Sequence, residues 1–200
     1  MQIMKVRAIS MTDKLQVVIA PLDGQTIPLA EVPDEVFSQK VLGDGAAIIP
    51  ADGRLRSPVD GEVSTVAETR HAYGFTSDDG LEILVHVGLD TVSLKGEGFK
   101  CHVREGDRVR AGDLVAEVDL NYIKARGLNT ITPVIICDGD NGKTLTAAAG
   151  SVRAGEDAVI TLTEAADAAI AAGVETAAAG KAATAAKNGK KGAINFDFLQ

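Results

Sequence analysis

The chain has 200 residues, a formal net charge of −8 and 46% hydrophobic residues, of which few are aromatic and none is Trp. This length suits one domain with a tail, and its core must be built from Val, Ile, Leu and Ala. The acidic balance argues against binding to a nucleic-acid backbone, which needs a basic face. The sequence contains neither a signal peptide nor an apolar run of the roughly 18 residues that span a membrane. We therefore expect a soluble, cytoplasmic protein.

Residues 1–14 are interpreted as an N-terminal leader, and a single domain is expected over residues 15–163. Within it, short apolar runs rich in β-branched residues alternate with Gly, Pro and Asp turn signals, at residues 15–21, 45–53, 57–63, 81–88, 114–119 and 132–139. This spacing is typical of an all-β fold, an antiparallel β-sandwich or barrel. Only residues 34–42 and 121–128 could form a turn or two of helix, so little helix is expected.

Composition changes near residue 163. Residues 164–191 are rich in Ala, Gly and Lys and have no sustained apolar face. They predict a flexible, partly helical linker. Residues 192–200 regain large apolar side chains, which suggests that another domain begins there.

Histidine is rare, and two of the three histidines, His71 and His86, flank a predicted β-hairpin whose turn signal is residues 77–80. A loop with an even number of residues would place them opposite or diagonal to each other on one face, with Cβ atoms about 5–8 Å apart. A three-residue loop would place them on opposite faces. With an even loop, Ile83, Val85 and Val87 point the other way, into the core.

Two adjacent imidazoles suit phosphoryl transfer. A pKa near 6.5 leaves a neutral, nucleophilic nitrogen at cytoplasmic pH without a separate base. One ring could carry the phosphoryl group while the other donates a hydrogen bond to its oxygens. Thr69 lies two residues before His71, on the same predicted strand face, and its hydroxyl could fix that ring's tautomer. The alternatives are histidines that only pack, and a zinc pair, for which two ligands are too few and no third is near in sequence.

Cys101 and Cys137 form no CxxC pair and are interpreted as reduced packing thiols. No metal site and no cofactor are predicted.

Several stretches together resemble one known family: residues 17–25, 31–50, 57–72, 84–99, 105–120, 132–138 and 150–156. Residues 15–163 are similar to the glucose-type IIA domain of the bacterial phosphotransferase system, EIIA type 1, and HVGLDTVSLKGEGF at 86–99 is highly specific. The resemblance implies an antiparallel β-sandwich that acts as a phosphoryl carrier in sugar uptake. It also implies that His86 is phosphorylated on Nε2, that His71 is needed to pass the group on, and that Thr69 orients His71.

The resemblance further implies a partner-binding apolar patch containing Val36, Phe37 and Val87, with Asp34 and Asp90 facing arginines of the donor. Val87, like Ala67, replaces an aromatic residue common in the family. The implied donor is phospho-HPr and the implied acceptor is a cysteine of a IIB domain. Residues 192–200 resemble the start of a membrane IIC domain, which would place the chain at the cytoplasmic face of the inner membrane.

Three other functions remain open. A biotinyl or lipoyl carrier would explain the strand–Gly–strand rhythm at 103–119, but the sequence has no Met-Lys-type attachment site there. A zinc-dependent peptidase would need a further ligand. A regulatory protein that binds partners according to its phosphorylation state is also compatible with the sequence.

Overall fold

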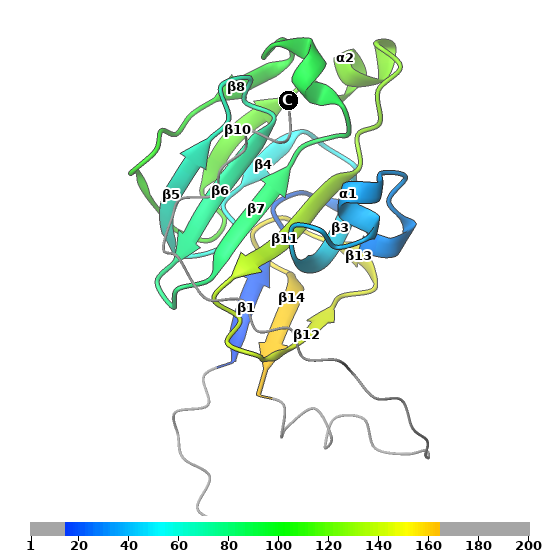
Figure 1. Cartoon of the computed structure of the whole chain (residues 1–200). Coiled ribbons are helices and arrows are strands. Elements are labelled where there is room, and N and C mark those ends of the chain that lie inside the picture. The colour runs from blue at the N-terminus through cyan, green and yellow to red at the C-terminus, as the bar shows by residue number, and fades with distance from the viewer. Residues whose placement is uncertain (1–14, 165–200) are drawn as a thin grey trace, which may run out of the picture.

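A computed structural model describes residues 15–164, and almost every regular element in that range is a β-strand (Figure 1). All paired strands run antiparallel, so the expected antiparallel β-fold with little helix is confirmed. The predicted leader, the rest of the linker after Glu164 and the predicted start of IIC lie outside the described residues.

The elements follow each other in this order: β1 Gln16–Ile19, β2 Gly24–Pro28, the 3-10 turn η1 Leu29–Glu31, α1 Glu35–Ser38, β3 Asp44–Pro50, β4 Arg54–Arg56, β5 Gly61–Val66, β6 Ala72–Ser77, β7 Glu82–His86, η2 Thr91–Leu94, β8 Phe99–Cys101, β9 Arg108–Val109, β10 Leu114–Val118, α2 Leu120–Ala125, β11 Thr132–Asp138, β12 Thr144–Ala147, β13 Gly150–Val152 and β14 Ala158–Thr163. Both helices fall where helical turns were predicted, and each begins at an Asp whose carboxylate accepts a backbone N–H of the first turn.

The centre of the molecule is an eight-stranded sheet in the order β13-β2-β3-β11-β7-β6-β5-β9. Two three-stranded sheets, β1-β14-β12 and β4-β10-β8, accompany it. Large apolar side chains from the three sheets form one main core that includes Val18, Leu55, Phe75, Ile83, Val85, Val115, Val134 and Ile160. The alternation of side chains along each strand puts this core on one face of the central sheet.

The opposite face of the central sheet carries a second, smaller apolar cluster, which we call the site-face cluster: Leu29, Val32, Phe37, Ala47, Ala67, Ala72, Leu84, Leu89 and Ile135. It is covered by η1 and α1, and Figure 1 shows α1 lying over β3 and β11. Leu84 belongs to this cluster whereas its neighbours Ile83 and Val85 belong to the main core. His86, two residues after Leu84 on the same strand, therefore lies on the site face.

The register of the β6–β7 hairpin differs from both predicted registers. Tyr73 pairs with Val85 and Thr76 with Glu82, and Ser77 N–H donates to the Leu81 carbonyl, so the loop has three residues, 78–80. Gly80 adopts φ +85°, the left-handed residue that closes such a loop. The expectation of an even loop is wrong. Ile83, Val85 and Val87 nevertheless point into the main core, as predicted.

Candidate functional site

His86 is the last residue of β7, and it is 5% exposed. Its Nδ1 lies 2.7 Å from the carbonyl oxygen of Gly88. A carbonyl oxygen can only accept, so Nδ1 carries the ring proton of the neutral imidazole and Nε2 keeps the lone pair. Gly88 turns its carbonyl back with φ +74°, and a Cβ there would lie 2.5 Å from Cγ2 of Thr91. Glycine is therefore required at this turn.

His71 lies next to His86 although the hairpin register alone would put it on the opposite face. The ring centroids are 4.9 Å apart, edge to face. The cause is a turn before β6: Arg70 has φ +58°, and its N–H donates to the carbonyl of Ala67. The chain thus enters β6 only at Ala72, and side-chain alternation does not extend to His71. The predicted pairing of the histidines is present, but the turn produces it and the register does not.

Thr69 holds the His71 ring, with 2.5 Å between the hydroxyl oxygen and Nδ1. Thr69 lies in the turn that precedes β6 and not on the strand, so its expected place on the strand face is wrong. Nε2 of His71 is buried and has no hydrogen-bond partner in the structure. A buried nitrogen without a hydrogen-bond partner is energetically unfavourable. Nε2 of His71 is therefore free to bond a ligand that enters the site.

Both imidazoles are kept neutral. Burial and, to a smaller extent, the neighbouring His86 together lower the pKa of His71 to about 4. Burial also lowers the pKa of His86 to about 4, against a weaker opposing effect of its hydrogen bond to Gly88. At neutral pH the pair is uncharged, and a nucleophilic lone pair is present without removal of a proton.

Four of the five predicted partner-binding residues lie on α1 with its N-cap or in the exposed turn after β7. The Phe37 ring packs against His86 with centroids 5.1 Å apart, but it is only 2% exposed and so walls the site. Val36, one residue earlier on α1, is half-buried, and Asp34 begins the helix by accepting the Val36 N–H. Asp90 is exposed and adopts φ +58° after the Gly88 turn.

Val87 is the exception. Its side chain is fully buried in the main core, behind the central sheet. The expectation that it contributes to the partner-binding surface is wrong, because its strand parity matches that of Val85 and not that of His86. Ala67, by contrast, belongs to the site-face cluster.

The third histidine makes its contact elsewhere, and Cys137 packs against the site-face cluster. His102 is exposed and its Nε2 contacts a carboxylate oxygen of Glu117 at 2.7 Å. Cys101 and Cys137 are free thiols. Among residues 15–164, no cluster of three or more His, Cys, Asp or Glu side chains could hold a metal ion. One ring of the pair offers a lone pair at Nε2, and its neighbour offers a buried nitrogen without a partner.

Two comparisons with known proteins agree with this geometry. Residues 16–142 match the family described as the phosphoenolpyruvate-dependent sugar phosphotransferase system, EIIA 1. The chain belongs to this family. It is also similar to the solved structure of glucose permease IIA from Mycoplasma capricolum, with 40% sequence identity and a TM-score of 0.71. That match covers 76% of this chain and 99% of the other. The chain is thus an EIIA domain, a phosphoryl carrier and phosphotransferase component in sugar uptake.

Within this EIIA domain, two features of the site were missed by reasoning from sequence. The Gly88 carbonyl selects the tautomer of His86, and the Phe37 ring forms a wall of the site. A glycine shortly after a strand was the only signal for the first. For the second, the resemblance pointed to Phe37 as a surface residue of the partner-binding patch and not as a buried wall of the site. No helix among residues 15–164 is long and apolar enough to cross a membrane. The longer of the two α-helices, α2, has six residues.

Proposed function

We propose that this EIIA domain accepts a phosphoryl group from phospho-HPr on Nε2 of His86 and passes it to a cysteine of a IIB domain. The observation that carries the proposal is the 2.7 Å contact between His86 Nδ1 and the Gly88 carbonyl. It leaves Nε2 as the nitrogen with a lone pair, whichever partner approaches. Burial keeps that ring unprotonated at neutral pH.

In the first step, Nε2 of His86 attacks phosphorus in line with the phosphorus–nitrogen bond of the donor's phosphohistidine. The new bond forms at Nε2 as the donor bond breaks, and the donor imidazole leaves with the electron pair. The Nδ1 proton of His86 stays on the ring, where its bond to Gly88 stabilises the more positive, phosphorylated imidazole. In the second step the cysteine thiolate attacks the same phosphorus and His86 leaves as the neutral imidazole.

His71 is proposed to stabilise the phosphoryl oxygens in both complexes and above all in the second transfer. If the Thr69 hydroxyl donates to Nδ1, then Nε2 of His71 carries a proton. That N–H is buried and unpartnered beside His86, so it is preorganised to donate to an oxygen of the transferring group.

The acidic rim is proposed to favour a basic donor. Asp34 caps α1, the helix whose Phe37 contacts His86, and Asp90 lies in the exposed turn after β7. Val36, also on α1, is a half-buried apolar residue. Complementary charge mainly raises the association rate and fixes orientation. A cytoplasmic location follows if these partners are correct.

Residues 164–191 are proposed as a tether, and residues 192–200 as the start of a fused IIC domain. Their support is the composition and the short resemblance in the sequence alone. A chain that ends at Glu164 should keep its melting temperature within a few degrees and should still be phosphorylated. A collapse of the fold on truncation would contradict the tether.

The direct test is radiolabel transfer from phosphoenolpyruvate through enzyme I and HPr. The unaltered chain should take up one acid-labile, base-stable phosphoryl group, and His86→Ala should take up none. His102→Ala removes an exposed histidine outside the site and is the matched control, which should label fully. Stoichiometric labelling of His86→Ala would contradict the proposal.

A further inference from the structure

The segment from Asp90 to Gly98, which follows the phosphorylatable strand, has an unusual backbone. Asp90, Lys95, Gly96 and Gly98 all have φ between +52° and +88°. Left-handed conformations at non-glycine residues are costly and persist only where the surroundings hold them. The segment therefore needs external support.

That support comes from α2 through Tyr122. Its ring packs on Gly98 so closely that a Cβ on that glycine would lie 3.0 Å from Cδ1 of the ring. Its hydroxyl donates to the carboxylate of Glu97. The Gly98 carbonyl in turn accepts the N–H of Asp119 at 2.8 Å, and the Asp119 carboxylate begins α2 by accepting the Tyr122 N–H.

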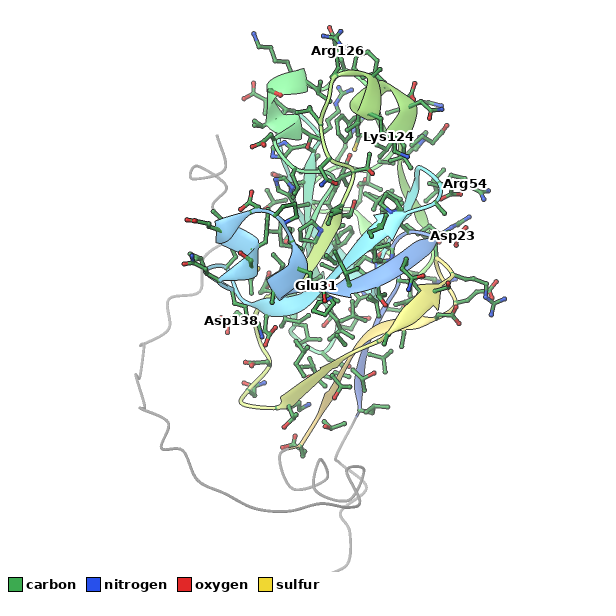
Figure 2. The ribbon with its side chains drawn as sticks, turned by 90° about the vertical axis from the view of Figure 1, so that its right-hand side faces the viewer. Asp23, Glu31, Arg54, Lys124, Arg126 and Asp138 are labelled. Atoms are coloured by element: carbon green, nitrogen blue, oxygen red, sulfur yellow. The ribbon has the colours of Figure 1, made fainter. Side chains whose placement is uncertain are left out.

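Arg126 completes this contact from one turn further along the chain. Its guanidinium donates to the Tyr122 hydroxyl at 2.6 Å, stacks over the ring at 4.8 Å and lies 3.6 Å from the Glu97 carboxylate. Figure 2 shows Arg126 and Lys124 together at one end of the molecule. We call Glu97, Tyr122 and Arg126 the α2 clamp.

The clamp is connected to the second histidine. A Cβ on Gly96 would lie 3.6 Å from the carbonyl oxygen of Thr69, so the backbone of the clamped segment lies against the turn that carries Thr69. The hydroxyl of that threonine holds Nδ1 of His71 at 2.5 Å. The chain of contacts runs from Tyr122 to Glu97, then through Gly96 to Thr69 and the His71 ring.

We propose that the α2 clamp positions His71 for onward phosphoryl transfer. Its residues touch neither histidine, so they are positioning residues that act through Thr69. The inference rests on the proposed role of His71. A donor that is displaced or tilted loses much of its effect on the transition state, so loosening the clamp should slow donation to the IIB cysteine more than acceptance from HPr.

The test compares Glu97→Ala with Glu97→Gln in the full chain. Glutamine keeps an acceptor oxygen for the Tyr122 hydroxyl, and alanine does not. We expect Glu97→Ala to lower the rate of transfer to a purified glucose-type IIB domain by about three- to tenfold, with acceptance from phospho-HPr nearly unchanged. Glu97→Gln should transfer to IIB at close to the rate of the unaltered chain, and Tyr122→Phe should behave like Glu97→Ala.

The matched control is Arg153→Gln, which breaks exposed contacts to Glu156 and Asp157 in the β13–β14 turn. It should leave both rates unchanged. An independent readout is the ¹⁵N spectrum of the imidazoles, in which Glu97→Ala should shift His71 toward mixed tautomers and leave His86 unaltered.

The ratio of donation to acceptance decides the inference. If Glu97→Ala keeps the ratio of the unaltered chain, whether both steps are unchanged or both slowed equally, the clamp does not position His71. That result is distinct from failure of the proposed function, in which the unaltered chain itself would not pass label from HPr to IIB.

Discussion

The two faces of the central sheet are built from the same strands but for different tasks. The face toward the two small sheets carries large apolar side chains such as Phe75, Ile83 and Val134, which belong to one continuous core. The other face is covered by η1 and α1 and holds two buried imidazoles, one with an unpartnered nitrogen. The first face provides stability. The second leaves a buried polar nitrogen without a hydrogen bond, as is typical of a reactive site held on a rigid support.

After His86→Ala, which should abolish labelling, the largest expected effect on the site face comes from His71→Gln. The amide has a similar reach but loses the ring geometry, and loss of one preorganised donor typically costs about 10²–10³ in rate. Transfer to IIB should fall by about that factor, measured by single-turnover label transfer, while acceptance from HPr remains close to normal. If acceptance is abolished as in His86→Ala, the two roles are shared or reversed. If neither step changes, His71 only packs.

A substitution on the main-core face should lower stability and leave phosphorylation close to normal. Ile83→Ala removes a fully buried side chain of the main core and should lower the free energy of unfolding by about 2–5 kcal/mol. The folded protein should still label at close to the normal rate, because His86 keeps its neighbours on the site face. Denaturant unfolding and HPr-dependent labelling measure the two effects. A variant of normal stability that labels slowly would contradict this division.

A smaller effect on stability should appear at acid pH. Both histidines have pKa values lowered to about 4, so between pH 4 and about 6.5 the unfolded chain binds more protons than the folded one. Their contribution to the free energy of unfolding is therefore fully present above pH 6.5 and is lost as the pH falls toward 4. Replacing both histidines by Gln should flatten this part of the stability curve. If the free energy of unfolding changes with pH equally in the unaltered chain and in the double variant, the rings are not buried in the neutral form.

The smallest expected effect concerns the acidic rim. Asp34→Asn with Asp90→Asn removes two charges while keeping an oxygen that can begin α1 and a residue that tolerates φ +58°. Phosphorylation by phospho-HPr should slow a few-fold at low salt, and the gap should close as salt screens the charges.

The control for the rim is Asp140→Asn with Glu156→Gln, which changes the net charge equally but on exposed loops outside α1 and the turn after β7. Asp138, two residues before Asp140, pairs with Glu82 at the opposite end of β7 from His86. If both double variants slow phosphorylation equally, the effect comes from overall charge and not from the position of Asp34 and Asp90.

Much of the fold could be predicted from the sequence because strand alternation and turn residues are local signals. Alternation even corrected the family resemblance at Val87, since it placed that side chain with Ile83 and Val85 in the core, where the structure has it. The hairpin register could not be obtained in this way. Asp79-Gly80 suits loops of either parity, and only the observed pairing of β6 with β7 fixes a loop of three residues.

The site was predictable only in part, for a similar reason. The pair of histidines was expected from an incorrect register and is produced by a left-handed Arg70, a residue type that carries no signal for that conformation. The Thr69–His71 contact was expected from the two-residue spacing and is present. The clamp of Glu97 by Tyr122 and Arg126 joins segments about 25 residues apart, and no local pattern predicts such a contact.

The most direct test of the central claim is to locate the phosphoryl group by NMR on the chain labelled with ¹⁵N histidine. Phosphorylated through HPr, the protein should show ³¹P coupling to Nε2 of His86, with its Nδ1 still protonated and bonded to the Gly88 carbonyl. Phosphorus on Nδ1 of His86, or on either nitrogen of His71, would contradict the account.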